Sequence, residues 1–358
     1  MLSRLLAIHS QLDQVEMHSP KGVVLAASAG IGVPRLFRSA GPAATVLLGH
    51  SFFVPRESKR DSIERLRRQL EWLRCAYNPI SVPQLLQKLE QGTVPDRAVV
   101  VTTDDALLDV YEVSEEFKSF GVPLAVFVCV GWVQSEGESA PERLIEAVTA
   151  LHWYNGPDSK VDLGNGLSFE LTASKKPAII DCILEERETI EPYLSTLCAK
   201  ISALKEPGLH RSVCNWRELR ELAASGVHIG AHSVSHVRIS QMSAIRQDFE
   251  IKESKRTIDT KIGQCISFAY PYGVQGTYNE ATLAQVKEAG FRCAFLSHSD
   301  FVTTRDDAFE LPRISIPGGD MPLYEFKARV RGGGIPLRKL KEGLTRFSSK
   351  KADQFAQS

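Results

Sequence analysis

The sequence has no Cys-x-x-Cys pair and no even set of cysteines, although it contains seven of them among 358 residues. Several cysteines lie in apolar runs, such as Cys129 within AVFVCV. A scattered, odd set of this kind does not indicate a disulfide framework, and we expect buried free thiols in a reducing compartment.

Long hydrophobic runs are also missing. The apolar stretch from Gly22 to Val33 is followed by Pro34 and Arg35, well short of the roughly 20 residues that a spanning helix needs. The first residues, MLSRLLAIHSQLDQ, have too short an apolar core for a secretory signal. We therefore expect a cytoplasmic protein without a transmembrane segment, and peripheral membrane contact through residues 1–40 stays open.

The chain has no excess charge of either sign, since 43 Lys and Arg balance 43 Asp and Glu. This balance gives no electrostatic reason to expect a nucleic-acid partner. With 43% hydrophobic and 24% charged residues, the composition is that of an ordinary globular protein. Its length suits one large α/β domain or two smaller ones.

Short apolar runs alternate with amphipathic segments along most of the chain. This order predicts a parallel sheet with helical crossovers, either a barrel-like (β/α) fold or an open doubly wound sheet. Strands are predicted at 44–48, 98–102, 123–130, 227–230, 266–270 and 292–297. Helices are predicted at 58–77, 110–120, 216–225, 243–262 and 279–289.

The pattern changes between residues 134 and 213. A polar opening is followed by helical pieces near 143–151 and 177–204 and by a hairpin-like stretch at 162–171. We interpret 134–213 as a helical insertion in a barrel of residues 44–330, with an extension at 1–43 and a tail at 331–358.

Three clusters of polar residues fall at the ends of predicted strands, where parallel α/β folds place their active sites. Asp104 and Asp105 follow the AVVV run, and one of two adjacent carboxylates can bind a metal while the other acts as a base. His232 and His236 follow the strand 227–230 at a spacing that lets both bind one metal. The third cluster is the Pro-Tyr-Gly turn within AYPYG.

Each cluster also has a simpler interpretation. The two aspartates can serve as a helix cap and a first-turn acid. The histidines can be structural, and the turn can be an ordinary loop.

The order and spacing of these clusters resemble the polysaccharide deacetylase family, which is the NodB-homology domain of carbohydrate esterase family 4. TTDDA resembles the family's T-F-D-D-G motif, HSVSH its H-S/T-x-x-H motif, and AYPYG the position of its R-x-P-Y motif. The likeness extends over about residues 44–317. It is closest to the branch of exopolysaccharide and lipopolysaccharide biosynthesis.

The resemblance implies a distorted (β/α)7-type barrel and a divalent metal, typically Zn²⁺. By matching positions, Asp105, His232 and His236 would hold the metal and Asp104 would be the base for the attacking water. The backbone N–H of Tyr272 would stabilise the oxyanion. The substrate would be an N-acetylated sugar of a glycan or glycan precursor.

Further residues are expected to line the substrate pocket. These are His50, at the end of the first strand, and Tyr270 and Pro271 in the third motif.

The sequence departs from the family pattern at several positions. Thr103 and Ala106 replace the Phe and Gly of the first motif, and Ala269 replaces the Arg that normally orients the base. Arg313 in LPRI is our candidate for that missing Arg, because its planar fork suits a carboxylate; the alternative is a surface charge at a strand end. His298 in Leu-Ser-His is the candidate general acid, although it comes earlier than the family's late L-x-H motif.

These departures leave two other functions open. The chain could be a non-catalytic family member that binds a glycan or a protein. It could also use the same barrel and metal to hydrolyse another C–N amide bond, because a fold does not fix the substrate.

Overall fold

The computed structural model describes residues 43–53, 57–133, 213–316 and 321–333, together with residue 335 and short stretches between 151 and 200. The chain divides into two compact units, one spanning Ala40–Asp320 and the other combining Met1–Ser39 with Met321–Ser358. In the second unit the described part is chiefly helix α14, Leu323–Val330. The sheet and the candidate site belong to the first unit.

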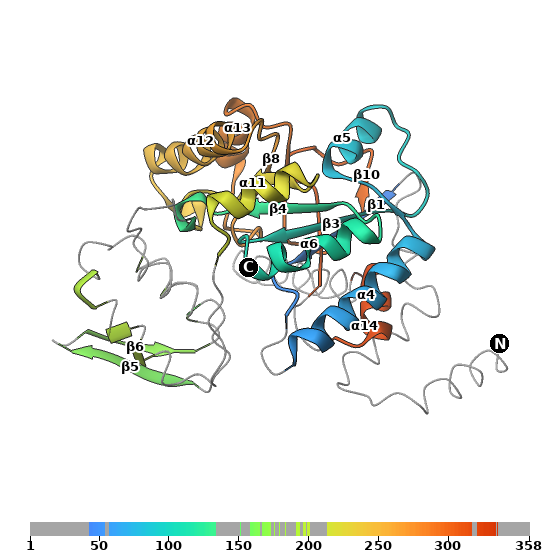
Figure 1. The fold of residues 1–358 in the computed structure, drawn as a ribbon. Coiled ribbons are helices and arrows are strands. Elements are labelled where there is room, and N and C mark those ends of the chain that lie inside the picture. The colour runs from blue at the N-terminus through green and yellow to red at the C-terminus, as the bar shows by residue number, and fades with distance from the viewer. Residues whose placement is uncertain are drawn as a thin grey trace, which may run out of the picture. The chain divides into compact units, whose positions relative to one another are not determined.

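A mostly parallel sheet forms the centre of the first unit (Figure 1). Its strands follow the order β10-β1-β3-β4-β7-β8-β9, with β2 paired to β3 and β11 paired to β1. Only β10 runs antiparallel to its neighbour among the described strands of this sheet. The strands are β1 (Ala43–Gly49), β2 (Asn78–Pro79), β3 (Ala98–Asp104), β4 (Leu124–Val128), β7 (His228–Ala231), β8 (Ser267–Ala269), β9 (Cys293–Phe295), β10 (Val302–Thr303) and β11 (Ile314–Ser315).

The segment 311–316 closes this sheet into a barrel. On one side, the N–H of Leu311 donates to the carbonyl of Ala294 at 3.0 Å, and the N–H of Leu296 donates to the carbonyl of Leu311 at 2.8 Å. On the other side, β11 pairs in parallel with β1, and the N–H of Ile316 donates to the carbonyl of Leu48 at 2.7 Å. The expected distorted barrel is therefore confirmed, and the open doubly wound sheet is excluded.

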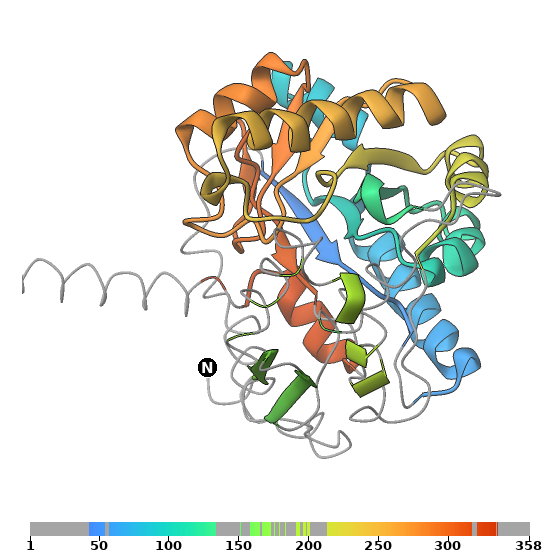
Figure 2. The same ribbon diagram turned by 90° about the vertical axis from the view of Figure 1, so that its left-hand side faces the viewer.

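Helices lie around the outside of the curled sheet, as both views show (Figures 1 and 2). Strand β3 is buried along its whole length, as expected for a parallel strand covered on both faces. The helices cover it with apolar stripes; α4, for example, buries Leu66, Leu70 and Leu73. The helices of this unit are α4 (Lys59–Ala76), α5 (Val82–Glu90), α6 (Leu108–Ser119), α11 (Trp216–Ala224), α12 (Ala244–Lys261) and α13 (Glu280–Glu288).

The predicted strands and helices of the barrel agree with the structure within one to three residues at their ends. The predicted hairpin at 162–171 is present as β5 (Ser159–Gly164) paired with β6 (Leu167–Leu171). Helices α5 and α14 were not predicted. The predicted helices at 143–151 and 177–204, the extension and the tail lie largely outside the described residues.

Within the described ranges, no helix combines the length and the apolar character needed to cross a lipid bilayer. The boundaries proposed for the extension, insertion and tail stay predictions.

Candidate metal centre and active site

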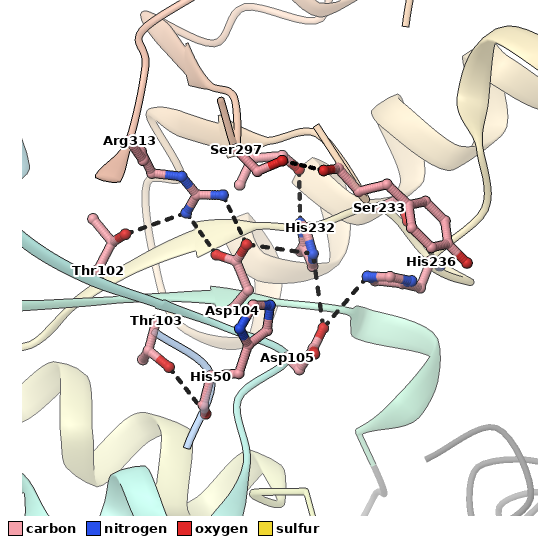
Figure 3. A network of polar contacts seen from close by, with 12 residues as sticks. His50, Thr102, Thr103, Asp104, Asp105, His232, Ser233, His236, Ser297 and Arg313 are labelled. Atoms are coloured by element: carbon pink, nitrogen blue, oxygen red, sulfur yellow. Dashed lines mark hydrogen bonds and ion pairs between the residues drawn. The ribbon is translucent and has the colours of Figure 1, made fainter. Parts of the chain in front are cut away.

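The polar residues of the site all follow the carboxyl ends of barrel strands. Asp104 ends β3 and Asp105 follows it, while His232 comes directly after β7. Because parallel strands present their carboxyl ends at one edge, residues separated by more than 100 positions meet there (Figure 3).

Asp105, His232 and His236 form a buried cluster that could hold a metal ion. One ligand atom from each, a carboxylate oxygen and two imidazole nitrogens, lies within 4.8 Å of the others. Asp105 Oδ1 is 3.7 Å from His232 Nε2 and 3.6 Å from His236 Nε2 (Figure 3). Nitrogen and oxygen donors in this arrangement suit Zn²⁺ and related divalent ions.

The orientation of His232 is fixed by the neighbouring strand. Its Nδ1 lies 2.8 Å from the carbonyl oxygen of Ala269, which can only accept, so Nδ1 carries the proton of the neutral ring. Burial lowers the pKa of His232, although Asp104 opposes this effect. In the neutral ring the lone pair of Nε2 therefore faces the carboxylate oxygen of Asp105, and a cation between the two acceptors would resolve their repulsion.

His236 is held between two aromatic side chains. The ring of Trp132 lies 5.2 Å from the imidazole and the ring of Tyr272 lies 4.8 Å from it, measured between centroids. The backbone N–H of His236 donates to the hydroxyl of Ser233 at 2.9 Å. These contacts leave the ring little freedom to turn away from Asp105.

Asp104 makes a different set of contacts. Nη1 and Nη2 of Arg313 each donate to one oxygen of Asp104 at 2.7 Å, and Nη1 also lies 3.2 Å from the hydroxyl of Thr102. Nε of Arg313 donates to the carbonyl of Leu296 at 2.8 Å. Because Arg313 is fully buried, the alternative of a surface charge is excluded.

The pKa values of the two adjacent carboxyl groups consequently shift in opposite directions. Burial alone raises the pKa of Asp104, but the Arg313 guanidinium and, less strongly, His232 lower it to about 2. Burial and the charge of Asp104 raise the pKa of Asp105 well above its ordinary value. The structure therefore holds Asp104 as an anion through Arg313, whereas at Asp105 the same guanidinium lowers the pKa by less than burial and the charge of Asp104 raise it.

The loops that carry the site have unusual backbone conformations. Ala106, at the position of the family's glycine, has a φ of 51°, which costs a residue with a Cβ of order 1 kcal/mol or more. Its carbonyl accepts from the N–H of Cys214 at 2.8 Å. Among the described non-glycine residues, positive φ occurs at Arg97 and at five positions in the site loops, namely Asp105, Ala106, Ser233, His236 and Tyr272. Such concentrations are typical of functional sites.

The structure places three other predicted residues at the same edge. His50 directly follows β1 beside Asp104, and its carbonyl accepts from the hydroxyl of Thr103 at 3.2 Å (Figure 3). Tyr272 packs its ring on His236, as described above, and its carbonyl accepts from the hydroxyl of Ser297. The half-buried His298 is next to this serine, and its carbonyl accepts from the N–H of Arg313 at 3.2 Å. The roles assigned to these three residues stay predictions.

Tyr270, which was expected to line the substrate pocket, is 1% exposed, and its hydroxyl donates to the carbonyl of Phe309 at 3.2 Å. Its ring stacks on Tyr278. The substrate contact of this side chain stays a prediction. Pro271 is also buried, and it accepts a hydrogen bond from the N–H of Gly273 within the turn.

Two carboxylates outside the three motifs were missed. Asp109 accepts hydrogen bonds from the hydroxyl of Ser51 and from the N–H groups of Phe52 and Phe53 beside His50. Glu250 accepts from the loop between the two histidines. In the sequence both look like ordinary helix acids; the only signal is that Glu250 falls on the apolar face of α12.

Known proteins share this sequence pattern and this fold. The sequence model of the polysaccharide deacetylase family matches residues 91–294, more than half of the chain. A Bacillus subtilis protein, YxkH, named as a polysaccharide deacetylase, is 22% identical over 260 residues, covering 68% of this chain and 88% of that protein.

Solved structures agree at the level of the fold. The Streptococcus pyogenes deacetylase PplD, in complex with acetate, has a TM-score of 0.53 at 17% identity, covering 81% of this chain and 99% of that one. The deacetylase domain of BpsB from Bordetella bronchiseptica has a TM-score of 0.50 at 18% identity, covering 79% and 98%. The fold of this chain is a closed barrel, and its sequence matches the family model over residues 91–294. This match shows that the chain belongs to the polysaccharide deacetylase family.

Proposed function

We propose that this protein is a metal-dependent hydrolase that removes the acetyl group from an N-acetylated sugar of a glycan or glycan precursor. The observation that carries the proposal is that two adjacent carboxylates at the end of β3 have different contacts. Asp105 faces two imidazole nitrogens, whereas Asp104, whose Oδ2 also lies 3.7 Å from His232 Nε2, is bound by the bidentate guanidinium of Arg313. The assignment to the exopolysaccharide branch rests on the sequence motifs and stays a prediction.

The donor set fits a divalent cation. Three protein ligands are the number used in catalytic zinc sites, where other positions stay open to water and substrate. The hydrogen bond from His232 Nδ1 to the carbonyl of Ala269 matches the outer contacts that orient metal-bound histidines. When bound, the cation would polarise the acetyl carbonyl and acidify a water molecule.

Groups of the protein itself would accept and donate the protons, stabilise the oxyanion and line the pocket. Asp104, kept ionised and oriented by Arg313, would accept the proton of the attacking water. The backbone N–H of Tyr272 would donate to the oxygen of the developing tetrahedral carbon. His298 is the proposed proton donor to the leaving amine, and His50 would line the pocket.

The buried ion pair also bears on the non-catalytic alternative, which was motivated by the missing arginine of the third motif. Arg313, immediately before β11, supplies a guanidinium to Asp104 from a different part of the chain. The guanidinium whose absence from the third motif suggested an inactive protein is therefore present at Asp104. This favours an active enzyme over a non-catalytic family member.

The decisive experiment measures released acetate from N-acetylated oligosaccharides, with and without a chelator. Asp104→Asn should lower kcat by about 10²-fold or more, because the amide cannot accept the proton. Asp105→Asn should remove both activity and bound metal. Asp96→Asn is the matched control, since Asp96 is exposed and precedes β3 at its opposite end. Full activity in Asp104→Asn, or in excess chelator with no metal retained, would overturn the proposal.

A further inference from the structure

The loop between the two histidines is held on both sides by groups outside the family motifs. On the β4 side, the N–H of Val130 donates to the carbonyl of Ser233 at 3.2 Å, and the N–H of Gly131 donates to the carbonyl of Val234 at 2.9 Å. On the α12 side, Oε2 of Glu250 accepts from the N–H of Val234 at 2.9 Å and from the N–H of Ser235 at 2.8 Å.

Glu250 therefore completes the hydrogen bonding of this loop. The N–H groups of Val234 and Ser235, two half-buried residues, both have this single carboxylate as their acceptor, and an N–H removed from water without an acceptor would destabilise the loop. Its bonds are charge-assisted, which makes each roughly twice as strong as a neutral one. The loop needs such support because Ser233 and His236 both have positive φ, a conformation that a free loop would leave.

The carboxylate itself is buried and fixed. Glu250 is 0% exposed, and its other oxygen lies 2.8 Å from Nη2 of Arg246, one turn earlier on α12. The same Nη2 is 3.1 Å from the hydroxyl of Ser235. Helix α12 thus contacts the loop through the ion pair of Glu250 and Arg246, and a shift of this loop moves His236 relative to His232, which is anchored separately on Ala269.

We infer that Glu250 is a positioning residue whose two hydrogen bonds to the histidine loop set the affinity of the Asp105, His232 and His236 cluster for a divalent cation. The inference rests on the proposed function, because it requires that cluster to bind a metal. Glu250 does not contact the cation or the substrate; it acts only through the backbone that places His236.

The test is a titration of metal-free protein with Zn²⁺ against a coloured chelator. Glu250→Gln keeps the shape of the side chain but removes its charge, and it should weaken Zn²⁺ binding by about 10-fold or more, as outer contacts of metal ligands typically do. The matched control is Asp248→Asn on the same helix, whose carboxylate pairs with Lys252 at the surface. This control should bind as the unaltered protein does.

Two further measurements separate positioning from general damage. Hydrogen exchange in the metal-free protein should show faster exchange at the amides of Val234 and Ser235 in Glu250→Gln. Arg246→Met, altered on an exposed side chain, should fold normally and weaken binding in the same direction by a smaller factor. Unaltered Zn²⁺ affinity in both Glu250→Gln and Arg246→Met overturns the inference alone. Absence of any divalent metal binding by the unaltered protein overturns the proposed function as well.

Discussion

Asp104 and Asp105 are neighbours in the chain, but their carboxylates meet different surroundings because a strand end sends successive side chains in different directions. Asp104 meets a guanidinium, and its pKa falls to about 2. Asp105 is buried beside the charge of Asp104, and these two effects outweigh the opposing charge of Arg313, so the pKa of Asp105 rises. The surroundings of two identical side chains thus shift their pKa values in opposite directions, as the proposed roles of a base and a metal ligand require.

Replacing Arg313 with Met should show how much of this difference depends on one side chain. Without the guanidinium, burial is no longer opposed and the pKa of Asp104 rises, so the acidic limb of the kcat/KM profile should move to higher pH. Breaking a buried pair also costs about 3–5 kcal/mol of stability. The acidic limb of Arg313→Lys should lie between those of the unaltered protein and Arg313→Met, because Lys keeps the positive charge but cannot make the bidentate contact of a guanidinium. An unmoved acidic limb in Arg313→Met would contradict this assignment.

A second titration is predicted away from the site, at the amino end of β7. Burial lowers the pKa of His228 from 6.5 to about 4, and its Nε2 lies 2.7 Å from the hydroxyl of Ser267. Between these pH values the unfolded chain binds more protons than the folded one, so stability falls as pH drops from about 6.5 to about 4.

Chemical denaturation at a series of pH values measures this effect. His228 should account for up to about 3 kcal/mol of the loss on acidification, at 1.36 kcal/mol per pKa unit. His228→Gln should show a shallower slope over that range, and a slope identical to that of the unaltered protein would rule out the assignment.

At the scale of elements, the turn Val130–Trp132 after β4 sets how closely the histidine loop can approach. A Cβ built on Gly131 would lie 2.5 Å from the carbonyl oxygen of Val234, a backbone atom that cannot turn aside. Gly131→Ala should therefore push the loop away, costing about 1–3 kcal/mol of stability and weakening metal binding.

Gly49→Ala is the comparison for this variant. The added methyl group would meet only the carbonyl of Thr102 at 3.9 Å, an ordinary contact. Thermal unfolding and Zn²⁺ titration of both variants test the difference. If the two variants have the same thermal stability and the same Zn²⁺ affinity, the loop accommodates the added methyl group without loss of stability, and the prediction is wrong.

Elements of the barrel could be predicted because their signals are local. The AVVV run before Asp104 and the apolar periodicity of α4 are visible in the sequence, and the structure confirms them. What the sequence could not show is which way a side chain points after a strand ends. The hydroxyl of Tyr270, for example, donates to the carbonyl of Phe309, a contact that no local pattern indicated.

Contacts between distant elements were harder to foresee. The pairing of Arg313 with Asp104 could be proposed only because the family pattern demanded a guanidinium, and its geometry depends on barrel closure. The contact of Glu250 with Val234 and Ser235 could not be foreseen, because an acid in a charged helix usually faces solvent and its place on the apolar face of α12 does not name its partners.

At the scale of the whole molecule, the proposed metal would join β3 to the loop after β7 across a barrel. Binding to the folded state alone stabilises it by RT ln(1 + [L]/Kd), about 4 kcal/mol at 1,000-fold excess over Kd. Zn²⁺ should therefore raise the Tm of the unaltered protein but leave Asp105→Asn unchanged.

In excess chelator at neutral pH, the order of stability of the unaltered protein and Asp105→Asn should reverse. Asp105→Asn should then be more stable than the unaltered protein, because the amide carries no charge into the buried site. Differential scanning of both proteins under both conditions tests the pair of outcomes. A chelated Asp105→Asn less stable than the chelated unaltered protein would contradict the raised pKa of Asp105.

The closure of the barrel by 311–316 has a consequence for how the protein is made. Arg313 leaves the ribosome 209 residues after Asp104, the carboxylate that it neutralises. Until that last segment is synthesised, a nascent chain would have to bury an uncompensated anion in order to assemble the earlier strands. Translation order therefore delays formation of the Asp104–Arg313 ion pair until nearly the entire barrel has emerged.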